Sequence, residues 1–109
     1  MKIAVANEGN MVAEHFGHCS KFSLFDIENG KVISREDIDN PGHKPGFLPV
    51  YLGNLGVKCV IVGGIGSRAV QLFAERGIEV IRGANGSIDA VIDTYLDGKL
   101  FDNDNMCDH

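Results

Sequence analysis

Apolar and polar positions alternate along the chain with two different periods, one typical of strands and one typical of helices. The first part shows only the strand period, in Lys2–Ala6, Lys21–Ile27 and Val32–Ile38. Between the second and third runs lies Asn29-Gly30, a dipeptide that is the strongest short hairpin signal. The chain is therefore predicted to begin with three strands. The third carries many charges and is expected at an edge of the sheet.

A strand, a glycine turn, a helix and a second strand are predicted within residues 58–82. The apolar run Cys59–Val62 is typical of a strand covered on both faces, which makes Cys59 a core residue. Ser67 is expected to cap the helix and Gly77 to end it. Such a unit joins two parallel strands by a right-handed crossover.

Two more helices are predicted by apolar residues at positions i, i+3, i+4 and i+7. Pro49 lies near the start of the first helix, and Ser87 is expected to cap the second. Their apolar faces consist of Leu48, Tyr51, Leu52 and Leu55 in the first, and of Ile88, Val91, Ile92 and Tyr95 in the second. The order of elements predicts an α/β fold, in which a mixed five-stranded sheet carries three helices on its faces. Residues 1–98 are expected to form one domain, and residues 99–109 a flexible tail.

The composition is that of one small soluble domain. The 109 residues have 44% apolar and 23% charged content and a net charge of −5. This charge argues against nucleic acid, and no apolar run approaches the roughly 20 residues that span a bilayer. The N-terminal apolar stretch is too short for a signal peptide, and three cysteines do not make a disulfide framework. We therefore expect a cytoplasmic protein with free thiols, either a monomer or a weak homodimer.

The first candidate site is the group His15, His18 and Cys19, which lies in the polar loop 7–20. Thiolate and imidazole are donors that iron, copper or a thiometallate cluster prefers. A loop on a rigid sheet can direct several such groups at one point. The alternative is structural, with His15 hydrogen-bonded to the backbone and Cys19 a small buried apolar residue.

The second candidate is the pair Cys107 and His109 at the end of the chain. Two donors are only half of a closed zinc site, and the chain has no CxxC motif to complete one. The pair would have to reach the loop 7–20 or another subunit. The alternative is an incidental thiol in a disordered terminus.

The third candidate is the glycine turn, with Gly64, Gly66, Ser67 and Arg68 as its binding residues. Its spacing formally matches a dinucleotide fingerprint, but the turn lies in the middle of the chain and lacks a clearly placed acidic partner. The plain interpretation is tight strand-to-helix packing. The functional interpretation is that backbone N–H groups and Arg68 bind an anion, which would explain a cation in the first turn of a helix.

These pieces, in this order, resemble the dinitrogenase iron-molybdenum cofactor biosynthesis family, the small NifX-like domains. The similarity includes His15-Phe16-Gly17 in the first loop, and Phe22 and Asp26 in the strand that follows. It continues through VKCVIVGGIGSRAVQLFAERGIEVIRG, Gly86 and YLDGKL, and so covers nearly the whole chain. The resemblance implies a ribonuclease-H-like fold. It also implies binding or carriage of metal–sulfur clusters rather than turnover of a substrate.

We therefore interpret the chain as a non-enzymatic protein that binds or carries a metal–sulfur cluster or cofactor precursor, iron–sulfur or molybdenum-containing. The expected position is a cleft between the loop 7–20 and the turn 63–68, with His15 as first ligand. The expected partner is a protein that donates or accepts the cluster. Nuclease activity is set aside because the first strand has no carboxylate to hold a metal. A small nucleotide- or phosphate-binding regulatory module and a plain interaction domain are the alternatives.

Overall fold

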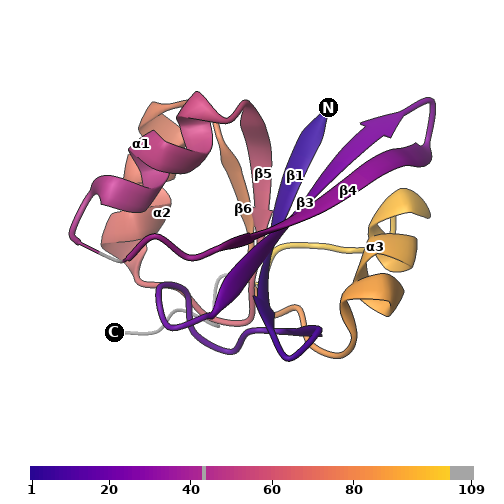
Figure 1. Cartoon of the computed structure of the whole chain (residues 1–109), viewed down its shortest axis with the longest axis horizontal. Coiled ribbons are helices and arrows are strands. Elements are labelled where there is room, and N and C mark those ends of the chain that lie inside the picture. The colour runs from indigo at the N-terminus through magenta and orange to yellow at the C-terminus, as the bar shows by residue number, and fades with distance from the viewer. Residues whose placement is uncertain (43, 104–109) are drawn as a thin grey trace.

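A computed structural model describes residues 1–42 and 44–103 of the chain, and within them a mixed sheet of six strands forms the centre (Figure 1). The strands are β1 (Lys2–Glu8), β2 (Met11–Val12), β3 (Lys21–Glu28), β4 (Lys31–Asp39), β5 (Val57–Ile61) and β6 (Glu79–Ile81). The helices are α1 (Phe47–Asn54), α2 (Ser67–Glu75) and α3 (Ile88–Leu96). The strand order is β4-β3-β1-β5-β6, and β2 pairs with β1.

The pairing directions agree with the predicted topology. β3 and β4 are antiparallel to their neighbours, whereas β1, β5 and β6 run parallel to one another. The highly charged β4 lies at one edge of the sheet, as expected. The α/β class, the mixed sheet and the three helices are thus confirmed among the described residues, while the narrower ribonuclease-H-like label stays a prediction.

The predicted number of five strands is wrong, because β2 adds a sixth. Its two residues fold back on the end of β1, where Val12 pairs with Asn7. The turn between them consists of Gly9 and Asn10, both with positive φ (61° and 65°). Two residues with positive φ make the tight turn that matches the twist of a hairpin. The Gly-Asn dipeptide is therefore the available signal for a hairpin in a segment whose polar sequence predicts only a loop.

The helices cover both faces of the sheet, with α1 and α2 together on one face and α3 on the other (Figure 1). Alternate residues of β1 reach the two sides, because side chains alternate along a strand. Ala4 and Ala6 pack with the first two helices, whereas Ile3 and Val5 pack with α3. Each face therefore has its own core, and the predicted apolar faces of α1 and α3 supply much of the packing.

A side chain caps the start of α3 but not the start of α2. Ser87 caps α3 as predicted, and its hydroxyl accepts a hydrogen bond from the N–H of Ala90 at 3.1 Å. Ser67 does not cap α2, which corrects our prediction. The N-cap is Gly66, whose extended backbone (φ −67°, ψ 149°) places Ser67 inside the first turn, and no side chain caps this end. The first turn of α2 therefore presents N–H groups to whatever faces it.

The first residues of the predicted tail are attached to the sheet. The Asp102 carboxylate accepts hydrogen bonds from Arg82 at 2.7 and 2.9 Å through the guanidinium and at 2.8 Å through the backbone N–H. Asn103 N–H donates to the carbonyl of Arg82 at 3.0 Å. The Arg82 side chain is only 12% exposed, so this ion pair is well shielded on one side. None of the helices in the described part of the chain is long and apolar enough to cross a membrane.

Stability at acid pH should depend on this contact. The hydrogen bonds from Arg82 hold the pKa of Asp102 below its ordinary value of 3.8, against an opposing effect of burial. A lowered carboxyl pKa stabilises the fold above the unfolded value, and this contribution is lost as the pH falls through the folded value. We expect Asp102→Asn to lower the free energy of unfolding by about 1 kcal/mol at pH 7, allowing for solvent screening of a partly exposed pair. Urea denaturation at pH 7 and at pH 2 should show a smaller difference in acid; a difference of equal size at both would contradict this.

Candidate functional site

The loop that follows β2 lies directly against the glycine turn between β5 and α2. The N–H of Phe16 donates to the carbonyl of Gly64 at 2.8 Å, and the N–H of Gly63 donates to the carbonyl of Ala13 at 2.9 Å. These two backbone hydrogen bonds join the loop to the glycine turn. The predicted closeness of these two segments is therefore confirmed.

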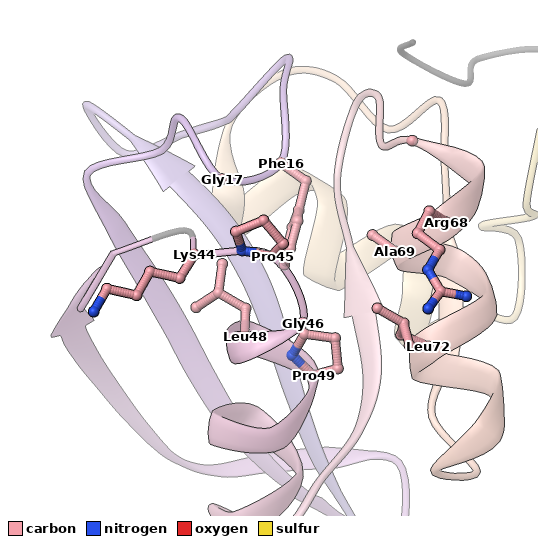
Figure 2. A pocket seen from close by; sticks show the side chains of 11 residues that line it. Phe16, Gly17, Lys44, Pro45, Gly46, Leu48, Pro49, Arg68, Ala69 and Leu72 are labelled. Atoms are coloured by element: carbon pink, nitrogen blue, oxygen red, sulfur yellow. The ribbon is translucent and has the colours of Figure 1, made fainter.

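A cleft of about 470 Å³ opens where these two segments meet the residues that lead into α1 (Figure 2). We call it the cleft; its walls come from residues 16–17, 44–49 and 66–72. Figure 2 shows Pro45, Leu48 and Pro49 on one side, and Ala69 and Leu72 on the side of α2. Its lining is therefore mostly apolar, and its volume is in the range of small-ligand sites.

The aromatic ring of Phe16 forms part of the cleft wall and is fixed by its neighbours. Its centroid lies 5.8 Å from that of Phe22 and 5.4 Å from that of Phe73, the latter in an edge-to-face arrangement. Phe22 and Phe73 are fully buried. Aromatic pairs at these separations are favourable beyond the area they bury, so the packing of Phe22 and Phe73 holds the Phe16 ring in place.

The charge of the cleft is opposite to that of the protein. Among the described residues that line it, the charged side chains are Lys44 and Arg68, which belong to opposite walls. In Figure 2 the Lys44 side chain extends outward, with its ammonium pointing away from Arg68. The whole chain has a net charge of −5. The uncapped start of α2 at Gly66 adds the positive end of a helix dipole to the same wall. The cleft therefore suits an anion, and one with an apolar or weakly hydrated surface.

His15 and His18 line a different hollow, of about 390 Å³, which we call the histidine hollow. Glu8, Met11 and Glu14 also contribute to its walls. The two hollows share one loop, because His15 lines this hollow and the next residue, Phe16, lines the cleft. The sequence predicts the imidazoles and the turn around one cleft, whereas in the structure the histidines line one hollow and the start of α2 lines the other.

The three donors predicted to form one metal site are not brought together. In residues 1–42 and 44–103, no group of three His, Cys, Asp or Glu side chains is arranged to hold a metal ion. Cys19 is 4% exposed and lines neither hollow. Burial raises the pKa of its thiol, which opposes the thiolate form that metals bind. Metal binding by His15 and His18 stays a prediction, whereas Cys19 is buried as the structural alternative expected.

Of the remaining candidate residues Cys59, Cys107 and His109, the structure describes only Cys59. Cys59 is fully buried, as predicted for a core position. Burial and the carboxylate of Glu79 raise the pKa of its thiol to about 12, so it remains protonated at physiological pH. Cys107 and His109 lie outside the described residues, and their predicted role as ligands is not addressed by the structure.

The wall of the cleft before α1 is not predicted from the sequence. The sequence indicates only a turn-rich loop at Lys44 and Pro45, and the start of a helix at Leu48 and Pro49. The available signal was a cation close to the N-terminus of a helix, the same pattern that we noted at Arg68. Sequence spacing alone could not predict that Lys44 and Arg68 line one cavity, because about 24 residues and a whole strand separate them.

Comparison with known proteins links the chain to one family. Residues 1–98 match the sequence profile of the dinitrogenase iron-molybdenum cofactor family. An uncharacterised protein of Methanocaldococcus jannaschii, MJ0580, is 39% identical over 105 residues, which cover 92% of this chain and 89% of that one. The crystal structure of PH0822 is similar with a TM-score of 0.88 and 35% identity, covering 94% and 95% of the two chains. The apo form of the orange protein from Desulfovibrio gigas has the same fold, with a TM-score of 0.78 and 23% identity over 94% and 92% of the chains.

Proposed function

Because this chain belongs to the dinitrogenase iron-molybdenum cofactor family, we propose that it binds and carries a metal–sulfur cluster or cofactor precursor. The cargo is anionic, either iron–sulfur or molybdenum-containing, and it is released unchanged. The observation that carries the proposal is the cleft itself. An acidic protein has a cavity of about 470 Å³ whose charged lining residues, in the described part of the chain, are both cations.

The chemistry of the lining supports a sulfur-rich anion over a strongly hydrated one. Phe16, Leu48 and Leu72 offer apolar surface, which suits the soft and weakly hydrated sulfides of a cluster. Arg68 on α2 and Lys44 at the outer rim bring positive charge to the cleft, and the first turn of α2 offers N–H groups. Each of these contacts is reversible, so a cargo held in this way can be transferred to an acceptor protein intact.

Two modes of holding the cargo follow from the two hollows. In the first mode the cleft alone holds the cluster by shape, charge and hydrogen bonds. In the second mode an imidazole adds a direct bond, with His15 as the first candidate and His18 as the second. His15 is exposed and lines the histidine hollow, and the next residue in the chain, Phe16, lines the cleft. Neither mode needs Cys19.

Anaerobic reconstitution tests the proposal. The protein is incubated with iron and sulfide, or with tetrathiomolybdate and copper, then desalted and examined by visible absorption and elemental analysis. We expect coloured protein with metal retained at about one cluster per chain, because a site with matched charge and shape binds well enough to survive desalting. A colourless protein without metal under both conditions would contradict the proposal.

The variant His15→Ala separates the two modes. If the cleft alone holds the cargo, His15→Ala should retain as much metal as the unchanged protein. If the imidazole is a ligand, the visible spectrum should change and retention of metal should fall.

The alternative of a nucleotide- or phosphate-binding module receives no support from the comparisons. Isothermal titration with a panel of nucleotides tests this alternative. Nucleotide binding lost in Arg68→Ala, together with no cluster retention, would favour that alternative.

A further inference from the structure

The side chain of Asn40, just beyond the end of β4, connects two segments near the cleft that are far apart in sequence. Its Nδ2 donates to the carbonyl of Cys19 at 2.9 Å and to the carbonyl of Gly17 at 3.3 Å, and lies 3.7 Å from Sγ of Cys19. Its Oδ1 accepts from the N–H of Gly42 at 3.0 Å. The backbone N–H of Asn40 donates to the carbonyl of Ser20 at 3.0 Å. The side chain thus uses both its donor and its acceptor group.

The orientation of this amide is fixed by its partners. A flipped side chain would direct Oδ1 at the carbonyls of Gly17 and Cys19 and the NH₂ group at the N–H of Gly42, so every bond would be lost. The amide satisfies both sides at once. A carboxylate accepts but cannot donate, and an apolar side chain does neither.

The bond to Gly17 matters because Gly17 lines the cleft. A carbonyl oxygen carries partial negative charge, so a free carbonyl at the wall would repel an anionic cargo. Two other lining residues have their carbonyls similarly engaged: Lys44 by the N–H of Phe47 at 3.0 Å, and Gly66 by the N–H of Val70 at 3.2 Å. In those two cases the partner is a helix or turn backbone. At Gly17 the partner is the Asn40 side chain.

We infer that Asn40 is a positioning residue that makes the cleft selective for anions. By binding the carbonyls of Gly17 and Cys19, it fixes the wall that carries Phe16 and withdraws an acceptor from the cargo. This inference rests on the proposed function and adds to it the reason why anions, rather than neutral or cationic guests, are preferred. Asn40 acts through the backbone of residues 17–19 and does not itself line the cleft.

Three variants test the inference, with tetrathiomolybdate as the anionic probe in anaerobic absorbance titrations. Asn40→Asp keeps the acceptor for Gly42 but loses both donors and adds a negative charge. Asn40→Ala loses the donors without the charge. Asn29→Asp is the matched control, because it makes the same chemical change in the β3–β4 turn, where an Asp-Gly turn is well tolerated.

We expect Asn40→Asp to weaken tetrathiomolybdate binding at least about tenfold and Asn40→Ala about threefold, with no change for Asn29→Asp. A purely structural role would lower the Tm of both Asn40 variants and leave their affinities equal to each other, which would overturn the inference. Unchanged affinity in both would overturn it as well. If Asn40→Asp does not fold, the threefold loss in Asn40→Ala decides the matter.

A second measurement separates this inference from the proposed function. Amide hydrogen exchange needs no cargo, and Asn40→Ala should speed exchange at residues 17–20 while β1 stays protected. If the unchanged protein binds no tetrathiomolybdate, the proposed function fails and the selectivity inference fails with it. In that case, faster amide exchange in Asn40→Ala would show that Asn40 supports the loop but has no role in binding. Unchanged exchange in Asn40→Ala would show that Asn40 does not fix residues 17–19 either.

Discussion

Gly63→Ala should destabilise the protein strongly and separate the loop after β2 from the glycine turn between β5 and α2. An added Cβ at this position would lie 2.9 Å from Cα of Glu14, 3.0 Å from the carbonyl oxygen of Ala13 and 3.1 Å from that of Glu14. All three are backbone atoms, so no side chain can rotate away to relieve the contact. Because overpacking in a well-packed core costs 1–3 kcal/mol and sometimes more, we expect a loss of about 3 kcal/mol in the free energy of unfolding.

Urea denaturation at pH 7 measures this loss, and Gly53→Ala provides the control. A Cβ at Gly53 in α1 would meet only the ends of two side chains, Ile78 at 3.6 Å and Arg76 at 3.7 Å. Since alanine also favours a helix, this control should keep or slightly raise stability, by up to about 1 kcal/mol. Equal stability for Gly63→Ala and the unchanged protein would mean that the loop does not lie against the turn as described.

The double variant Lys44→Gln with Arg68→Gln should lose most of its affinity for an anionic cluster while it stays folded. Both side chains are exposed, so neither contributes to the core, but both line the cleft from opposite walls. Removing two charge-assisted contacts to an anion should cost about 2–4 kcal/mol, which is roughly 30- to 1000-fold in Kd. Anaerobic titration with tetrathiomolybdate measures the change.

Lys31→Gln with Lys99→Gln is the matched control for this prediction. It removes the same two positive charges from exposed positions that do not line the cleft. If the net charge of the protein determined binding, both double variants would lose the same affinity for tetrathiomolybdate. That result would contradict a role for the cleft. The affinity of the unchanged protein should also fall with added salt, and this salt dependence should be smaller in the cleft variant.

The fold could be predicted well where each element carries its own signal. Asn29-Gly30 gave the hairpin, with both residues at positive φ, and Gly77 at φ 72° ended α2 as expected. The errors concern short elements in which one or two residues decide the outcome. β2 depends on the turn at Gly9 and Asn10, and the start of α2 depends on whether Gly66 or Ser67 has the extended backbone.

The candidate site was predictable only in part, because proximity along the chain differs from proximity in space. The sequence indicates Arg68 as a candidate because a cation is unfavourable in the first turn of a helix. The opposite wall of the cleft, at Lys44, comes from a segment that precedes α1 and β5. His15, His18 and Cys19 are close in sequence, yet the chain turns at Gly17, with φ 90°, and buries Cys19 while both histidines remain exposed. Such a division depends on backbone direction at a single residue.

The position of the bound cargo tests the central claim most directly. Crystals of the protein loaded anaerobically with tetrathiomolybdate would show the metal by anomalous scattering at the molybdenum edge. Our account predicts one main peak in the cleft, between the ring of Phe16 and the first turn of α2, within reach of Arg68. A main peak beside His15 and His18 in the histidine hollow, or peaks scattered over the surface with the cleft empty, would contradict it.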